Sequence, residues 1–257
     1  MSKKKQIKSI KRLLLIMDEL REKCPWDKKQ TFDSLKSLTI EETYELVDAI
    51  SENNIDEIKN ELGDLLLHII FYSKIASETN QFDISDVADS ISEKLIYRHP
   101  HVYENQKEIS EEEVKLNWEK LKLKDGNNSV LQGVPKTLPP ILKSMRIQQK
   151  VSNVGFKWIE NKNVKEKVLE ELEEFLDETN LTNSQKIQDE FGDLLFSLIN
   201  YGRFIGIDPN SSLEKTNKKF IKRFMSLENK INLEKKNIQN YSKKELVGLW
   251  NLAKKND

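Results

Sequence analysis

Two sets of four acidic residues repeat in this 257-residue chain with the same internal spacing. The first set is Glu42, Glu45, Glu61 and Asp64, and the second set is Glu171, Glu174, Glu190 and Asp193. Each member of the second set lies 129 positions after its counterpart (171 − 42, 193 − 64). A lone Glu-x-x-Glu is typical of a solvated helix face, but a matched repeat of eight acids predicts a cluster of oxygen donors. Such a cluster suits a divalent metal ion and phosphate chemistry.

Each acidic set must be positioned by two helices joined by a turn. The midpoints between paired acids fall at residue 53 in the first copy and at residue 182 in the second, where Asn-containing segments predict turns. Residues equidistant from such a turn lie level in an antiparallel pair, so Glu42 should face Asp64 and Glu45 should face Glu61. Acids three residues apart share a helix face at about 4.5 Å along the axis. Packed helices lie about 8–10 Å apart, so all four side chains can reach one ion.

The donor chemistry selects the ion. Four close carboxylates repel one another unless a cation compensates their charge. Carboxylate oxygens suit Mg²⁺, with Mn²⁺ as an alternative. Zinc prefers His and Cys ligands, and three His with one Cys cannot supply two such sites. Gly63 and Gly192, each directly before the Asp, would let the helices or a ligand approach closely.

The surroundings of the two sets differ. Lys167 precedes the second set by one helical turn, where the first copy has Leu38. A helical ion pair with Glu171 and a contact with phosphate are both open for Lys167. Asp189 in the second copy corresponds to Asn60 in the first.

Further residues flank the second set along the chain. Lys219, Lys222 and Arg223 cluster on a later helix and would supply cations to a polyphosphate. Trp250 could stack on a base, but an aromatic residue at helical spacing more often packs in a core. His68, which Ser197 matches in the second copy, is interpreted as a packing residue rather than a ligand.

Apolar residues recur at helical spacing almost throughout the chain. Helices are predicted from about residue 10 to 20, at 34–51, from 56, at 84–97, from 110, from 141, and at 162–179, 184–205, 211–232 and 242–255. Gly, Pro and Asn in residues 124–140 predict a linker. The sequence therefore predicts an all-α fold built from two tandem modules, residues 1–123 and 141–257, joined by this linker.

Composition excludes several classes of protein. The chain has 42 basic and 43 acidic side chains, a balance that gives no case for nucleic-acid or membrane binding. Cys24 is the only cysteine, so an intrachain disulfide is excluded. No apolar run approaches the roughly 20 residues of a membrane span, and residues 10–17 lack a signal-peptide cleavage site. We expect a soluble, cytoplasmic protein.

Five ordered segments carry a resemblance to a known family. They are Cys24-Pro25-Trp26-Asp27, residues 38–45 (LTIEETYE), residues 61–66 (ELGDLL), residues 98–102 (RHPHV) and residues 153–156 (NVGF). Together they resemble the MazG family of nucleoside triphosphate pyrophosphohydrolases, and the likeness covers nearly the whole chain, including the duplication.

The resemblance implies an all-α fold, Mg²⁺ dependence and hydrolysis of nucleoside triphosphates, with broad specificity, to monophosphate and pyrophosphate. It also implies a homodimer in which helices of two subunits build the site, with the main activity in the C-terminal module. By position, the metal ligands would be Glu171, Glu174, Glu190 and Asp193. The nucleotide contacts would be Lys167, Glu170, Asp189, Lys219, Lys222, Arg223 and Trp250. The N-terminal copy keeps the acids but lacks the Lys and Asp equivalents, so turnover and a structural or regulatory role are both open there.

The expected chemistry is metal-assisted hydrolysis. Glu170 or Glu174 would position or deprotonate the attacking water, and Lys167 with the later basic cluster would offset charge developing on pyrophosphate. Three alternatives stay open. One is a narrower pyrophosphohydrolase for dUTP, dCTP or a phosphoribosyl nucleotide. Another is a di-iron bundle, which would need Glu-x-x-His motifs that the acidic sites lack. The third is a non-catalytic helical interaction protein.

Overall fold

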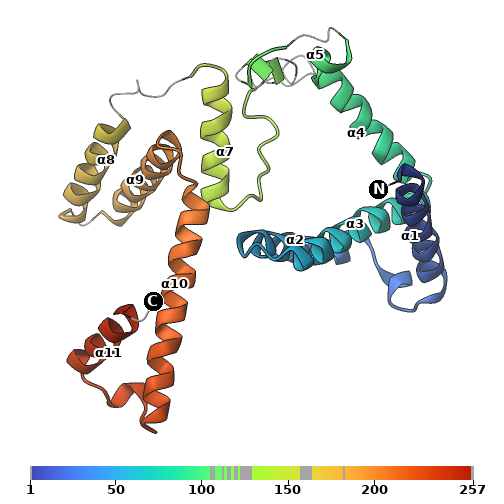
Figure 1. Cartoon of the computed structure of the whole chain (residues 1–257). Coiled ribbons are helices and arrows are strands. Elements are labelled where there is room, and N and C mark those ends of the chain that lie inside the picture. The colour runs from blue at the N-terminus through green and yellow to red at the C-terminus, as the bar shows by residue number, and fades with distance from the viewer. Residues whose placement is uncertain are drawn as a thin grey trace. The chain divides into compact units, whose positions relative to one another are not determined.

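The computed structural model describes residues 2–104, 108–111, 113–114, 117–118, 121, 129–156, 164–181 and 183–255. Within these ranges the chain forms helices and no β-strand, which confirms the predicted all-α fold. The chain divides into two compact units, residues 1–108 and 109–257 (Figure 1). The module boundary expected at residue 123 stays a prediction, and residues 124–128 of the expected linker lie outside the described residues.

The first unit consists of consecutive helices joined by short turns. They are α1 (Lys3–Lys23), the 3₁₀ turn η1 (Asp27–Lys29), α2 (Phe32–Ser51), α3 (Ile55–Ser77), α4 (Ile84–Arg98) and the short α5 (Pro100–Tyr103). α2 packs along α3, and α3 also contacts α1 and α4. The N-terminal acids therefore lie on one antiparallel hairpin, as the midpoint argument predicts.

Local sequence signals fix the ends of these two helices. Thr31 caps α2 by accepting from the Ser34 amide at 3.2 Å, and the Ser34 hydroxyl accepts from the Thr31 amide at 2.8 Å. Asn53 has a φ of 54°, a left-handed conformation that Asn tolerates better than most residues. Asn54 then caps α3 by accepting from the Glu57 amide. The predicted turn at Asn53-Asn54 is confirmed.

The core of the first unit lies between α1, α2 and α3. Met17, Leu35, Ile70 and Phe71 are each at most 3% exposed and pack together. Leu38 and Leu66 are among the half-buried residues that surround this cluster. Burial of side chains of this size contributes about 1.5–3 kcal/mol each, and this packing holds the α2–α3 hairpin against α1.

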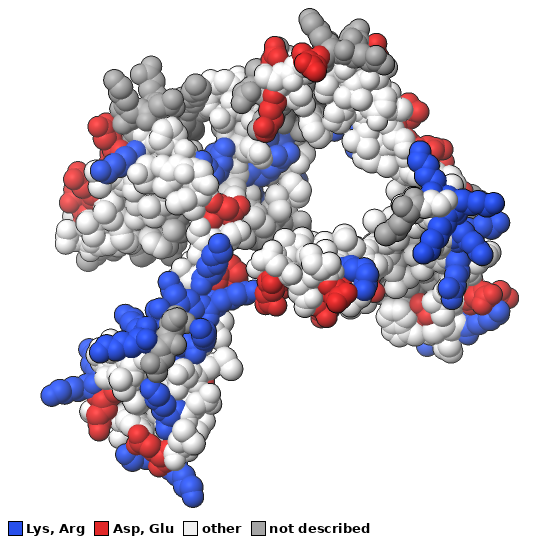
Figure 2. Space-filling view, viewed as in Figure 1, with Lys and Arg blue, Asp and Glu red and all other residues white. Residues whose placement is uncertain are grey.

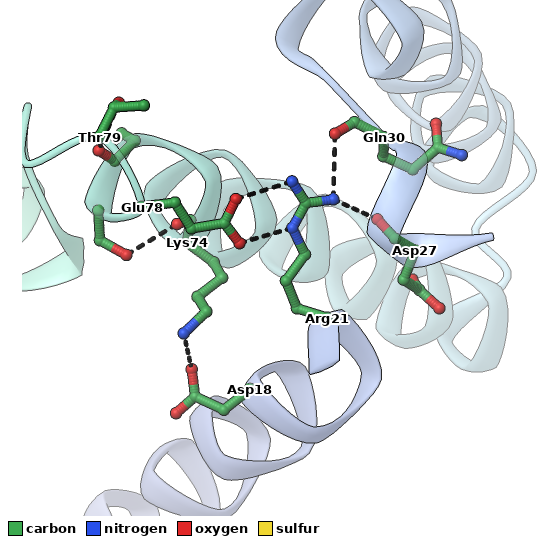
Figure 3. A network of polar contacts seen from close by, with 9 residues as sticks. Asp18, Arg21, Asp27, Gln30, Lys74, Glu78 and Thr79 are labelled. Carbon is green, nitrogen blue, oxygen red and sulfur yellow. Dashed lines mark hydrogen bonds and ion pairs between the residues drawn. The ribbon is translucent and has the colours of Figure 1, made fainter. Parts of the chain in front are cut away.

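A polar network fixes the segment that leads into α2 (Figure 3). Arg21 at the end of α1 makes a bidentate pair with Glu78 after α3, at 2.7 and 2.9 Å. The same guanidinium donates to the carbonyl oxygens of Asp27 and Gln30. Arg21 holds the pKa of Glu78 below its ordinary value, mainly through this hydrogen bond. Arg21 thus joins the end of α1 and the turn that follows it to Glu78, which lies 57 positions away.

The second unit repeats the helical order after residue 139. Its described helices are α7 (Pro140–Asn153), α8 (Val164–Thr179), α9 (Ser184–Phe204), α10 (Pro209–Leu233), the 3₁₀ turn η2 (Ile238–Asn240) and α11 (Lys243–Lys255). α8 packs along α9, α9 contacts α7, and α10 contacts α7 and α9 and packs against α11 (Figure 1). The C-terminal acids therefore also lie on a two-helix hairpin.

Capping residues again mark the predicted boundaries. Asn183 caps α9 by accepting from the Gln185 amide at 3.2 Å. A capping box is present at Ser110, where a helix is predicted to begin: the Ser110 amide donates to Glu113 at 2.9 Å, and the Glu113 amide donates back to Ser110 Oγ. The helix predicted to follow Ser110 falls partly outside the described residues. Among the helices that the structure describes, none has the length and apolarity needed to cross a membrane.

Candidate metal centre

The N-terminal carboxylates converge from both legs of the α2–α3 hairpin. Glu42 and Glu45 on α2 and Glu61 on α3 each offer an oxygen within 4.8 Å of the others. Glu61 is 8% exposed, and its Oε2 is buried without a hydrogen-bond partner. Asp64 is exposed and stands outside this close trio.

The electrostatics of this trio follow from its geometry. Burial raises the pKa of Glu61, and the charges of Glu45 and Asp64 raise it further. Burial also raises the pKa of Glu42, with Asp64 and Glu45 as the next causes. Asp64 is therefore close enough for its charge to act on the cluster. Carboxyls perturbed in this way favour a compensating cation.

The C-terminal carboxylates are arranged in the same manner. Glu171 and Glu174 on α8 and Glu190 on α9 offer oxygens within 4.8 Å of one another. Glu171 is buried, whereas Asp193 is exposed and again lies outside the trio. Burial raises the pKa of Glu190, followed by the charges of Glu174 and Asp193. The two copies thus reproduce one donor arrangement.

Lys167 lies at the edge of the C-terminal trio. Its ammonium is 2.7 Å from Glu170 Oε1 and 2.8 Å from Glu171 Oε1. The hydrogen bonds that Lys167 donates to Glu170 and Glu171 raise the pKa of Lys167 above its ordinary value. The helical ion pair that the sequence leaves open is therefore present. It also places a cation beside the carboxylates, where a phosphate oxygen would meet it.

Both trios fit a hard divalent cation. The donors are carboxylate oxygens only, the set that Mg²⁺ and Mn²⁺ accept. The unpartnered buried oxygen of Glu61 is the kind of atom that a bound cation would satisfy. His68, one turn after Asp64, is not part of the trio; it is 6% exposed and bonds to Thr39, as expected for a packing residue.

The remaining sequence-predicted residues lie on three helices. Asp189 is exposed on α9 next to Glu190 and accepts a hydrogen bond from Gln185 at 3.1 Å. The basic residues predicted to contact nucleotide lie on α10, where Figure 2 shows Lys and Arg gathered; they are Lys219, Lys222 and Arg223. Trp250 on α11 packs against Phe220 on α10, with ring centroids 5.0 Å apart. Trp250 therefore packs between two helices, the interpretation that the sequence favoured.

One further acid, Glu178, acts on the C-terminal trio although it does not belong to the repeated sets. Glu178 lies on α8 two turns after Glu171, and its charge contributes to the raised pKa of Glu190. Its Oε1 is 3.6 Å from the Lys186 ammonium across the hairpin. The seven-residue spacing was visible in the sequence, but the corresponding residue of the first copy is Ala49, so the repeat did not reveal it.

The two glycines before the Asp residues do not mark a close helix contact. A Cβ built on Gly63 or Gly192 would meet no atom within 4 Å. The expectation that these glycines let the helices of one chain approach is therefore wrong for the described residues. Both glycines sit on exposed turns of their helices, beside Asp64 and Asp193.

Comparisons with known proteins agree with this arrangement. A family model described as the MazG nucleotide pyrophosphohydrolase domain matches residues 30–103 and 160–226, one segment per hairpin. The nucleoside triphosphate pyrophosphohydrolase of Escherichia coli (strain K12) is 40% identical over 228 residues, which is 85% of this chain and 87% of that protein. The nucleoside triphosphate pyrophosphohydrolase/pyrophosphatase MazG of Thermotoga maritima is 39% identical over 250 residues, 95% of each chain.

One solved structure also aligns with part of the chain. The crystal structure of a MazG-related protein from Thermotoga maritima covers 44% of this chain and 98% of its own, with 26% identity and a TM-score of 0.40. The family assignment rests on the family model and on these two relatives, which match 85% and 95% of this chain at about 40% identity. The chain belongs to the MazG nucleotide pyrophosphohydrolase family and is a hydrolase of that class.

Proposed function

We propose that the C-terminal module hydrolyses nucleoside triphosphates to monophosphates and pyrophosphate in a Mg²⁺-dependent reaction of broad specificity. The observation that carries this proposal is the close trio Glu171, Glu174 and Glu190 with Lys167 at its edge. Relatives that match most of the chain are named nucleoside triphosphate pyrophosphohydrolases, which supports the substrate class.

Glu171, Glu174 and Glu190 would hold the metal, with Asp193 next to them. A bound Mg²⁺ would polarise the phosphoanhydride and compensate its negative charge. Lys167 would add a second positive charge for the phosphate oxygens, because its ammonium already lies 2.8 Å from Glu171 on the site's edge. Glu170 is exposed and outside the trio, so its carboxylate is accessible to a water molecule. Glu170 or Glu174 would orient or deprotonate that water.

Broad specificity follows from the kind of groups that form the cluster. Carboxylates and a lysine address a metal ion and phosphates, which all nucleoside triphosphates share. Trp250, the candidate for base stacking, packs against Phe220 in this chain. Comparing turnover across the eight common triphosphates tests this part of the proposal, and a strong preference for one base would contradict it.

We also propose that the active protein is a homodimer. Large apolar side chains on the α8–α9 hairpin are 38–50% exposed; they are Leu169, Leu172, Leu176, Phe191, Leu195 and Leu198. Exposed apolar residues that recur at helical spacing on both helices are typical of an interaction surface. A second copy covering the hairpin would also bring further groups to the carboxylates, and the basic residues of α10 are suited to that role.

A matched pair of variants tests the catalytic proposal. Glu174→Gln removes one member of the trio, whereas Glu173→Gln changes an exposed neighbour outside it. We expect Glu174→Gln to lower Mg²⁺-dependent pyrophosphate release by about 10²–10⁴-fold, while Glu173→Gln stays near the wild-type rate. A folded Glu174→Gln protein with the wild-type rate would refute the assigned role.

A further inference from the structure

A buried polar cluster lies directly beneath the N-terminal carboxylates. The Thr39 hydroxyl on α2 is 2.7 Å from His68 Nδ1 and 2.7 Å from the Tyr72 hydroxyl, both on α3. It is also 3.0 Å from the Leu35 carbonyl oxygen. His68 is 6% exposed, and Thr39 and Tyr72 are half-buried. The buried His68 ring therefore has its hydrogen-bond partner within the protein, in the Thr39 hydroxyl.

The three contacts of the Thr39 hydroxyl determine where its proton lies. A hydroxyl donates one hydrogen bond and accepts two. The Leu35 carbonyl oxygen can only accept, so Thr39 donates to it. The other two partners must then both donate to Thr39. Tyr72 can do so through its hydroxyl, and His68 can do so only if Nδ1 carries the proton.

This proton position affects the neighbouring metal-site acid. His68 lies one helical turn after Asp64, close enough for the Asp64 charge to act on the imidazole ring. A neutral imidazole protonated at Nδ1 has an unprotonated Nε2, which accepts hydrogen bonds and donates none. His68 therefore cannot donate to Asp64 from Nε2, and the Asp64 carboxylate stays available to a cation.

The cluster also joins the two helices of the hairpin. Thr39 precedes Glu42 by three residues and His68 follows Asp64 by four, so their layer lies about 4.5–6 Å along the helix axes from the acids. Hydrogen bonds in this layer join α2 to α3, the helices that carry Glu42 and Asp64.

In the second copy, other residues stand at the positions of Thr39 and His68. The counterparts of Thr39 and His68 are Val168 and Ser197. Ser197 is buried, and its hydroxyl donates within α9 to the Leu194 carbonyl oxygen at 3.0 Å. The cross-helix cluster is therefore a property of the N-terminal hairpin, although both hairpins carry the same four acids.

We propose that Thr39 and Tyr72 lock His68 in the Nδ1–H tautomer, and that His68 is thereby a positioning residue for the N-terminal carboxylates. The tautomer follows from the hydrogen bonds alone. The positioning role rests on the proposed function, because it extends the metal binding proposed for the C-terminal trio to Glu42, Glu45 and Glu61.

The tautomer is tested by NMR on the ¹⁵N-labelled full chain at a pH where histidine is neutral. Long-range ¹H–¹⁵N correlations distinguish a protonated ring nitrogen from an unprotonated one. His99 and His101 are the other two histidines, so loss of one set of signals in His68→Asn assigns His68. We expect Nδ1 to be protonated and Nε2 unprotonated, and we expect Thr39→Val to abolish this preference. An Nε2–H signal for His68 in the wild type would overturn the proposal.

The positioning role is tested by Mn²⁺ titration followed by EPR. The parent is the full chain carrying Glu174→Gln and Glu190→Gln, which dismantles the C-terminal donors. Adding His68→Leu should raise the dissociation constant for Mn²⁺ about 10-fold, the lower end of the effect of residues that support metal ligands. His68→Asn should restore binding to within about twofold, since its amide can donate from near the Nδ1 position. Ser197→Ala is the matched control and should have no effect.

The outcomes separate the two proposals. Equal binding by the parent and His68→Leu would refute the positioning role while leaving the metal site in place. Equal weakening by Leu and Asn would show that packing rather than the donated hydrogen bond matters, and would also refute it. A parent that binds no Mn²⁺ would remove the proposed N-terminal metal site and the positioning role together, whatever the tautomer.

Discussion

The two hairpins carry the same acids at the same positions, yet the side chains next to these acids differ in charge. On α8, Lys167 bonds to Glu170 and Glu171 at the edge of the carboxylates. On α2 the corresponding residue is Leu38, which packs against the apolar core. Among the described residues, no ion pair reaches the N-terminal trio, and Glu61 keeps a buried oxygen without a partner.

The difference bears on two separate requirements of the reaction, metal binding and polyphosphate binding. Three convergent carboxylates form a donor set that suits a divalent cation, and both hairpins have such a set. Binding a polyphosphate also requires positive charge beside the metal, and Lys167 provides it in the C-terminal hairpin. The N-terminal hairpin instead has a hydrogen bond between Thr39 on α2 and His68 on α3. We infer that the first site binds metal and the second site both binds metal and turns over substrate.

The strongest test of this comparison removes one equivalent acid from each copy. Glu174→Gln should lower pyrophosphate release by about 10²–10⁴-fold, whereas Glu45→Gln should leave it within about twofold. The reason is that Lys167 lies at the edge of the C-terminal trio, whereas the N-terminal copy has Leu38 at that position. Steady-state pyrophosphate release with saturating Mg²⁺ measures both, and Glu41→Gln controls for loss of an exposed acid. Comparable losses in both variants would show that the two sites act as one catalytic unit.

Much of the hairpin geometry could be predicted from the sequence. The helical spacing of the apolar residues predicted the helices. The symmetry of the acids about Asn53 predicted the turn, which the structure confirms. The acids appeared level in pairs, but the structure groups three of them and leaves Asp64 exposed. The midpoint argument places the acids along the helix axes, but it does not determine which of the side chains converge.

Contacts between residues far apart in the chain could not be predicted from the sequence. Arg21 pairs with Glu78, 57 positions away, and nothing in the local pattern of either residue indicates the other. The bond from His68 to Thr39 was missed for a related reason, since an apolar layer at those positions would give the same helical period. Side-chain pairing across helices depends on rotation and rotamer, which periodicity leaves undetermined.

Lys167→Leu sharpens the comparison, because it gives the C-terminal hairpin the residue that the N-terminal one has. We expect kcat/KM for a nucleoside triphosphate to fall by about 10–100-fold. The loss should be smaller than for Glu174→Gln, since Lys167 is 27% exposed and solvent screens its charge. Lys167→Arg keeps the charge and should retain more activity than Lys167→Leu. Unchanged kcat/KM in Lys167→Leu would reduce Lys167 to a helical ion pair.

The smallest expected effect concerns the stability of the metal-free protein. Burial and neighbouring acids raise the pKa of Glu42, Glu61 and Glu190 above the ordinary 4.5. The folded chain therefore binds more protons than the unfolded chain in the range just above that value, and stability falls as pH rises through it. Acids whose pKa is lowered by folding, such as Glu78, make stability fall as pH decreases below 4.5. The measurement should therefore be made above pH 4.5.

We therefore expect Tm without metal to fall by about 2–4 °C between about pH 5 and pH 7. Saturating Mg²⁺ should remove this slope, because the cation replaces the protons as compensation for the carboxylates. Scanning calorimetry on Glu61→Gln and Glu190→Gln assigns the slope to each hairpin. The N-terminal hairpin should contribute more of it, since Lys167 already offsets charge in the C-terminal one. An equal contribution from both hairpins, or a slope that Mg²⁺ leaves intact, would mean that Lys167 does not distinguish the two sites electrostatically.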